Sequence, residues 1–123
     1  MGRESKAGGG QVLLVDDEGV ALQVLGHGLE REGFNVTCVD DPATALRKIR
    51  ARPGRYRVMV TDLNMPKMSG IQLARSVRAS SPRTRIILHS SDPKQHPPYV
   101  DLVVAKSDCI SELVDGLSKL LVD

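Results

Sequence analysis

Three aspartates follow two short apolar runs of the chain, and their placement suggests shared chemistry. Asp16 and Asp17 come directly after the run QVLLV, and Asp62 comes directly after VMVT. Ligands of open α/β sheets bind at the carboxyl ends of the strands, so these side chains can meet there. Three carboxylates in one pocket repel each other, and a hard divalent cation such as Mg²⁺ removes that repulsion. Asp62 alone could equally be a turn residue, because aspartate is common in turns.

A lysine and a hydroxyl follow two further apolar runs. Lys106 ends the run DLVVA, and Ser90 follows the run RIILH. A carboxylate nucleophile, a metal ion, a lysine and a hydroxyl are the groups that phosphoryl transfer uses, because the transferred group carries negative charge on its oxygens. The sequence therefore indicates a site for phosphoryl chemistry.

The elements that must position these groups alternate between strand and helix. Apolar runs predict strands at residues 11–15, 34–39, 57–61, 85–89 and 101–105. Helical spacing predicts helices at residues 18–31 and 70–79, one that follows an Asp41 cap and ends near residues 51–54, and a last one capped by Ser107. Such alternation is typical of an α/β fold with a parallel sheet.

Composition is that of an ordinary globular chain. The 123 residues predict a flexible leader at 1–10 and one domain at 11–123. A net charge of +2 and three aromatic residues argue against direct nucleic acid binding. We expect no secretory signal or membrane span, and we expect Cys38 and Cys109 to be buried free thiols in a reducing cytoplasm.

Over roughly residues 11–121 the chain resembles the receiver domain of two-component response regulators. The resemblance rests on Asp16-Asp17, on the stretch Asp-Leu-Asn-Met-Pro-Lys-Met-Ser-Gly that begins at Asp62, on Ser90 and on Lys106. It implies a flavodoxin-like, doubly wound five-stranded parallel sheet of order 2-1-3-4-5 with helices on both faces. It also implies a signalling phosphoacceptor instead of an enzyme.

The resemblance assigns a role to each residue. Asp62 would be the phosphoacceptor, and Mg²⁺ would be bound by Asp17, Asp62 and the backbone carbonyl of Asn64, with Asp16 acting through water. Lys106 would pair with a phosphoryl oxygen. The switch hydroxyl would be Ser90, although its neighbour Ser91 leaves that assignment open by one position. The donor would be a histidine kinase or a histidine phosphotransfer protein.

Three features depart from the family. Lys106 is followed by Ser107 where the family has proline, so we expect a trans bond there. Val103 stands where the family often carries an aromatic switch residue. Residues 91–100 contain three prolines, so the fourth helix should be missing or reduced to a turn near residues 93–96, with Ile87 or Val103 exposed. The side of strands four and five would then carry a homodimer or an output partner.

Other functions stay open at this point. A receiver-like interaction module could keep the pocket and yet switch atypically or not at all. A phosphatase of the haloacid dehalogenase type would need a second aspartate where Asn64 stands, and no Gly-x-Gly-x-x-Gly follows the first strand. The kinase, the pathway and the output cannot be read from the sequence.

Overall fold

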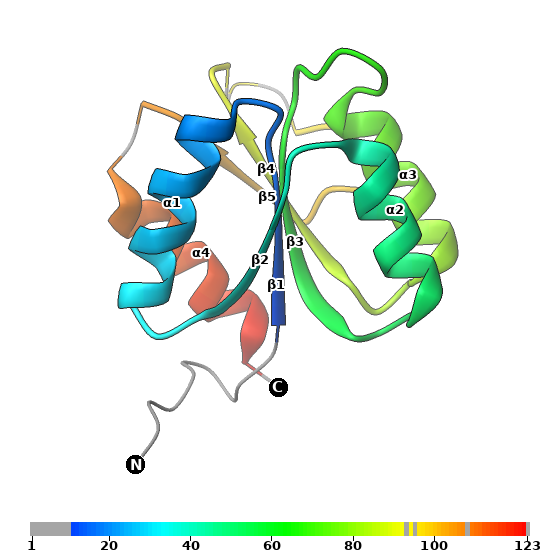
Figure 1. The fold of residues 1–123 in the computed structure, drawn as a ribbon, viewed down its shortest axis with the longest axis horizontal. Helices are drawn as coiled ribbons and strands as arrows, with labels where there is room; N and C mark the ends of the chain where they lie inside the picture. Colours follow the sequence, from blue (N-terminus) through cyan, green and yellow to red (C-terminus); the bar gives the residue numbers. More distant parts are fainter. Residues whose placement is uncertain (1–10, 93, 95, 108, 123) are drawn as a thin grey trace.

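The computed structural model of the protein describes residues 11–92, 94, 96–107 and 109–122. Its strands form one parallel sheet of order β2-β1-β3-β4-β5, as the sequence predicts (Figure 1). The strands are β1 Gln11–Val15, β2 Asn35–Val39, β3 Tyr56–Asp62, β4 Arg85–Ser90 and β5 Leu102–Ala105. The helices of the described residues are α1 Gly19–Arg31, α2 Pro42–Ala51, α3 Gly70–Ser80 and α4 Ile110–Leu121. The predicted leader at 1–10 lies outside the described residues.

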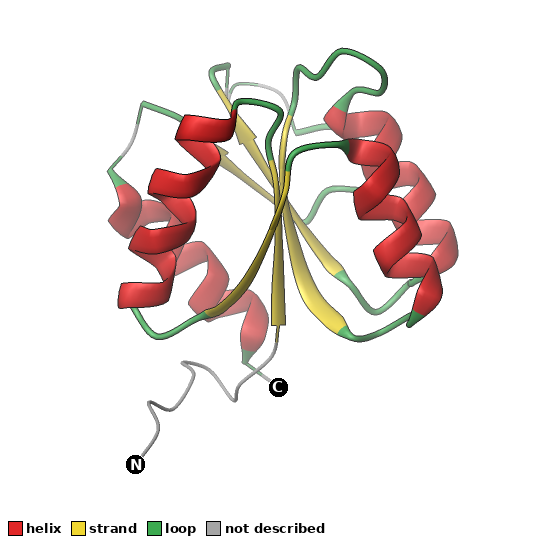
Figure 2. Cartoon of the chain, viewed as in Figure 1, coloured by secondary structure: helices red, strands yellow, loops and turns green. Residues whose placement is uncertain are grey.

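Helices cover both faces of the sheet, and each face has its own core. Helices α1 and α4 lie on one face, and α2 and α3 lie on the other (Figure 2). Alternate residues of β3 serve the two cores: Val58 and Val60 pack on the α1–α4 side, whereas Met59 packs on the α2–α3 side. This two-sided burial explains why the strands read as continuous apolar runs. Within the described residues, no helix is long and apolar enough to span a membrane.

Two helix starts were predicted from N-cap residues; the prediction for Asp41 is confirmed and the prediction for Ser107 is wrong. The side chain of Asp41 caps α2 by accepting from the amide of Thr44 at 3.0 Å. Ser107 does not cap the last helix: α4 begins at Ile110 with Cys109 in the cap position. The strand before it ends at Ala105, as the sequence predicted, and the amide of Lys106 donates to the Ser90 carbonyl at 2.8 Å. The Lys106–Ser107 bond is trans, as expected.

No helix occurs among the described residues of the segment 91–100, so the prediction that the family's fourth helix is missing is confirmed. The helix labelled α4 is the C-terminal one. The expected exposure of Ile87 was wrong, because its side chain points to the face that α4 covers. Val103 is half-buried, and Val100 of the segment itself packs into the α2–α3 core. Residues 93 and 95 of the expected turn lie outside the described residues.

Both cysteines are free, but the prediction that they are buried was wrong, since both are exposed. Cys38 lies on β2, which is an edge strand of the sheet and is only partly covered. Cys109 lies in the turn before α4.

Asp101, which follows the 91–100 segment, links the chain at that point to α3 and β4 through hydrogen bonds. Asp101 accepts hydrogen bonds from the Ile86 amide at 2.8 Å, from Arg78 at 2.8 Å and from Arg85 at 3.3 Å. Arg78 also donates to the Tyr99 carbonyl at 3.0 Å. Burial alone would raise the pKa of Asp101, but the Ile86 amide and the two arginines outweigh it and hold the pKa below its ordinary value.

Replacing Asp101 by alanine should lower the free energy of unfolding by about 2 kcal/mol at neutral pH, because a charged acceptor shared by three donors is lost. A lowered folded pKa stabilises the protein above the unfolded value of about 3.9, and this stabilisation disappears as pH falls through the lower folded value. Denaturant unfolding of wild type and variant should therefore differ at neutral pH and converge in acid. A gap that persists in acid would contradict the role of the charge. The control is Asp115→Ala, which removes an exposed carboxylate and should not change the free energy of unfolding in this way.

Candidate functional site

The carboxylates of Asp16, Asp17 and Asp62 meet at one edge of the sheet. Val15 of β1 pairs with Thr61 of β3, so the residues that follow these two are neighbours. One oxygen from each of the three carboxylates lies within 4.8 Å of the others. Asp16 and Asp62 are buried, with exposed fractions of 5% and 7%, whereas Asp17 is exposed. The register of two strands thus builds the acidic pocket that the sequence predicted.

Lys106 reaches this pocket from the end of β5. Its Nζ lies 3.0 Å from an oxygen of Asp62 and 3.8 Å from an oxygen of Asp16. Burial alone would lower the pKa of Lys106, but the hydrogen bond and charge of Asp62, together with Asp16 and Glu18, outweigh it and raise the pKa. The lysine is therefore held as a cation beside the carboxylates.

Ser90 ends β4 with its side chain fully buried. Its hydroxyl donates to the Asp92 carbonyl at 3.1 Å and accepts from the Asp92 amide at 3.0 Å, while its own carbonyl accepts from the Lys106 amide. Ser91, the alternative that the sequence left open, is exposed. Asn64 is exposed in the turn after β3.

The turn after Asp62 depends on Gly70, the last residue of the quoted stretch, to which the sequence alone assigned no structural role. The Gly70 amide donates to the Leu63 carbonyl at 2.8 Å, and a Cβ at this position would overlap the carbonyl oxygen of Asp62. Ser69 and Gln72 cap the following helix reciprocally, a pattern that the spacing Ser-x-x-Gln could have revealed. The backbone of Asp62, the last residue of β3, thus lies directly against the first turn of α3.

Replacing Gly70 by alanine should lower the free energy of unfolding by about 1–3 kcal/mol, because the added methyl displaces the backbone at Asp62. Phosphorylation of the folded fraction should also slow. Gly19→Ala is the matched control: a Cβ there meets nothing within 4 Å, so stability should be unchanged or slightly raised. If chemical denaturation showed equal stability of the two variants, that would contradict the close approach of Gly70 to the Asp62 carbonyl.

A cavity of about 420 Å³ adjoins the pocket between α1 and the start of α4. Its lining combines two residues of the charged site, one histidine and four apolar side chains, namely Asp16, Lys106, His89, Ala21, Val24, Leu25 and Ile110. Three apolar side chains are exposed there or beside it: Val20 at 77%, Val24 at 68% and Ile110 at 38%. We call these three residues the apolar rim.

Comparison with known proteins identifies the class that this fold and pocket define. The response regulator receiver domain family matches residues 12–111, and the chain belongs to this family. A response regulator receiver protein of Brucella abortus, CpdR, is 28% identical over 118 residues, which cover 91% of this chain and 97% of that protein. TcrX of Mycobacterium tuberculosis, a probable transcriptional regulatory protein, is 35% identical over 77 residues, or 63% of this chain and 32% of TcrX.

Solved structures of receiver domains are similar to this chain in fold. The response regulator TrrA of Thermotoga maritima, in complex with Mg²⁺ and BeF, is 28% identical with a TM-score of 0.82 over 90% of this chain and 98% of TrrA. The receiver domain of the hybrid histidine kinase CckA has a TM-score of 0.79 at 22% identity over 91% of this chain and 99% of that domain, which shows the shared fold. The protein is therefore a receiver domain, a signalling phosphoacceptor and not an enzyme in the ordinary sense.

The pocket fits Mg²⁺. Its donors are hard carboxylate oxygens from three residues, which is the chemistry that this ion prefers. Bound there, Mg²⁺ would neutralise charge on the carboxylates and on a phosphoryl group. The acidic pocket of Asp16, Asp17 and Asp62 thus serves Mg²⁺-dependent phosphorylation of an aspartate.

Proposed function

We propose that Asp62 is the phosphoacceptor of this receiver. The contact of Lys106 Nζ with an Asp62 oxygen at 3.0 Å is the observation that carries the assignment. An Asp62 oxygen attacks the phosphorus of a phosphohistidine, the P–N bond breaks, and the imidazole nitrogen keeps the electron pair. Lys106 then pairs with a phosphoryl oxygen, because it is a cation that already contacts the attacking carboxylate.

The remaining roles are those that the receiver family implies, and the clustering of the three carboxylates supports them. Asp17 and Asp62, with the backbone carbonyl of Asn64, would hold Mg²⁺ directly, and Asp16 would hold it through water. Asp16 is less free to move than Asp17, since it is buried and one of its oxygens accepts from the Glu18 amide at 3.0 Å. Ser90, and not Ser91, is the proposed switch hydroxyl, because it is buried at the end of β4 and linked to the Lys106 backbone.

The phosphodonor is proposed to be a histidine kinase or a histidine phosphotransfer protein of the cytoplasm. TrrA has been solved in complex with the histidine kinase ThkA, and this chain is 28% identical to the chain matched there. The apolar rim lies beside the cavity that contains Asp16 and Lys106, where a donor helix could bring its histidine to Asp62. Buried apolar contacts at such a rim would supply affinity.

Replacing Val24 by glutamate should slow transfer from the phosphorylated histidine protein by about tenfold, because a charge replaces an apolar contact. Labelling by acetyl phosphate, which needs no docking surface, should stay unchanged. Val122→Glu alters a valine that is 67% exposed on the far end of α4 and should affect neither reaction. Slowing of both reactions by Val24→Glu would place the defect in the pocket instead.

Beryllofluoride with Mg²⁺ tests the proposed function, because it mimics the phosphorylated aspartate. We expect amide NMR shifts at Lys106, Ser90 and Asp92 in the wild type and none in Asp62→Ala. A second candidate, a receiver-like interaction module without switching, is favoured by the lack of a helix among the described residues of 91–100. Binding that leaves Ser90 and Asp92 unshifted would support this second candidate. In either case the side of β4 and β5 is a proposed surface for a second copy or an output partner.

A further inference from the structure

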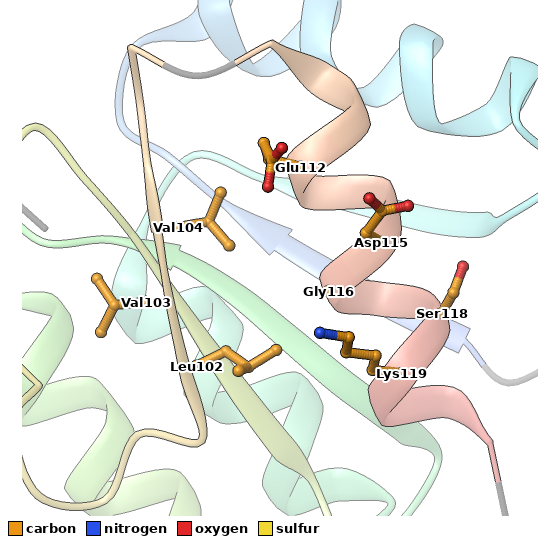
Figure 3. A pocket seen from close by; sticks show the side chains of 8 residues that line it. All are labelled: Leu102, Val103, Val104, Glu112, Asp115, Gly116, Ser118 and Lys119. Atoms are coloured by element: carbon orange, nitrogen blue, oxygen red, sulfur yellow. The ribbon is translucent and has the colours of Figure 1, made fainter.

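Charge is divided unevenly between the two sides of the protein. Residues 42–91, which include α2 and α3, contain eleven arginines and lysines and one acidic residue, the buried Asp62. Residues 11–41, which include α1, contain seven acidic residues and one arginine. The groove between β5 and α4 is lined by Glu112 and Asp115 as well as by Lys119 (Figure 3). The net charge of +2, on which the sequence argued against nucleic acid binding, therefore conceals a basic side of the molecule.

Four exposed arginines lie where α2 leads into β3 and α3 leads into β4. Arg50 is in the last turn of α2, Arg52 and Arg55 follow that helix, and Arg83 follows α3. We call these four residues the arginine cluster. Both turns lie at the amino ends of β3 and β4 (Figure 1), whereas Asp62 is at the carboxyl end of β3. The cluster is therefore at the opposite end of the sheet from the acidic pocket.

Hydrogen bonds between buried hydroxyls join the two turns. The Ser81 hydroxyl accepts from the Gly54 amide at 2.9 Å and lies 2.8 Å from the Thr84 hydroxyl. Thr84 in turn donates to the Tyr56 carbonyl at 2.8 Å, and both hydroxyl side chains are buried. The backbone that carries the arginine cluster is thus fixed before a ligand binds, which lowers the cost of ordering it.

The charge of the cluster is available to an anionic ligand. Among the described residues, no acidic side chain forms an ion pair with any of the four arginines. Arg50 and Arg55 donate only to a serine hydroxyl and a glutamine side chain, which are uncharged. A helix dipole attracts cations to the last helical turn, which accounts for Arg50. Arg52, Arg55 and Arg83 lie beyond the helices, so the dipoles do not explain them.

We propose that the arginine cluster binds the phosphate backbone of double-stranded DNA. Guanidinium groups match phosphate oxygens in geometry and stay charged at physiological pH. Apolar side chains, which anchor protein partners and membrane surfaces, are exposed elsewhere: in the part of the chain that the structure describes, the large ones are Val20, Val24, Tyr99, Ile110 and Val122. A phosphate backbone needs no such anchor.

The surroundings of the cluster favour a DNA duplex over other nucleic acids. The aromatic ring beside it, that of Tyr56, is buried, so the bases of a single strand would have no platform to stack on. Duplex RNA is recognised through its 2′-hydroxyls as well, whereas phosphate contacts alone bind duplex DNA without reading its sequence. The contact needs no phosphoryl group on the protein, so it goes beyond the proposed function.

Fluorescence anisotropy with a labelled DNA duplex of arbitrary sequence tests the proposal on the unphosphorylated full chain. The wild type should bind at low salt with a dissociation constant of about 10⁻⁵ M, in the range of sequence-independent binding. Each phosphate contact contributes about −0.9 to the slope of log affinity against log salt, so four arginines predict a slope of about −3 to −4.

Arg52→Gln/Arg83→Gln removes two of these contacts, so affinity at low salt should fall about tenfold and the slope should flatten by about 2. The matched control, Arg31→Gln/Lys119→Gln, removes two charges from exposed sites on α1 and α4 and should keep the wild-type slope. All four substituted residues are exposed, so both variants should fold normally. Asp62→Ala should bind DNA at least as tightly as the wild type, which separates this test from that of the phosphoacceptor.

Three results would each overturn the proposal. The first is no binding of the duplex by the wild type at low salt, which would leave the arginine cluster to an acidic protein. The second is equal loss of affinity in the two double variants, which would mean that total charge and not the cluster governs binding. The third is tighter binding of duplex RNA, or of vesicles that contain phosphatidylserine, than of the DNA.

Discussion

Asp62→Ala will abolish labelling of the protein by acetyl phosphate in the presence of Mg²⁺. The carboxylate that Lys106 contacts at 3.0 Å is removed, and neither neighbour can replace it. Asp16 lies farther from the lysine, at 3.8 Å, with one oxygen engaged by the Glu18 amide, and Asp17 is exposed at the rim of the pocket. The loss should be complete within detection, because a covalent nucleophile has no partial substitute.

The matched control for this substitution is Asp115→Ala, which removes an exposed carboxylate on α4 and should label like the wild type. Circular dichroism should show that both variants are folded. Labelling of Asp62→Ala at the wild-type rate would move the phosphoacceptor to another residue.

Asp17→Asn will remove about half or more of the stabilisation that Mg²⁺ brings. An ion that binds only the folded state adds about 2.7 kcal/mol at a concentration one hundred times its dissociation constant. Loss of one charged ligand should weaken binding about tenfold or more, so the same Mg²⁺ concentration adds about half as much. Without Mg²⁺ the variant should be at least as stable as the wild type, because one of three mutually repelling carboxylates is gone.

Chemical denaturation with and without Mg²⁺ measures both effects in one series. Glu18→Gln is the control, since Glu18 follows the aspartate pair but does not belong to the cluster of three carboxylates. An Mg²⁺-induced gain in Asp17→Asn equal to that of the wild type would contradict the role of Asp17 as a ligand.

Much of the fold was predictable because its signals are local. Buried parallel strands produce continuous apolar runs such as VLLV and VMV, and aspartates at the ends of β1 and β3 mark the site edge. The prolines of 91–100 predicted the missing helix for the same reason, since each acts on its own stretch of backbone.

The errors concern properties that depend on distant parts of the chain. Whether Ile87 is buried depends on which face of the sheet it points to, and α4 covers that face. The need for glycine at position 70 depends on how closely α3 approaches Asp62, and the role of Asp101 depends on two arginines from other elements. None of these tertiary contacts can be read from a local sequence pattern.

The position of the phosphoryl group tests the central claim most directly. The wild type is incubated with acetyl phosphate and Mg²⁺, reduced with borohydride, which converts an aspartyl phosphate to homoserine, and digested for peptide mass spectrometry. The account predicts a single acid-labile phosphoryl group per chain and homoserine at Asp62 alone. Homoserine at Asp16 or Asp17, or an acid-stable phosphate on Ser90, would contradict it.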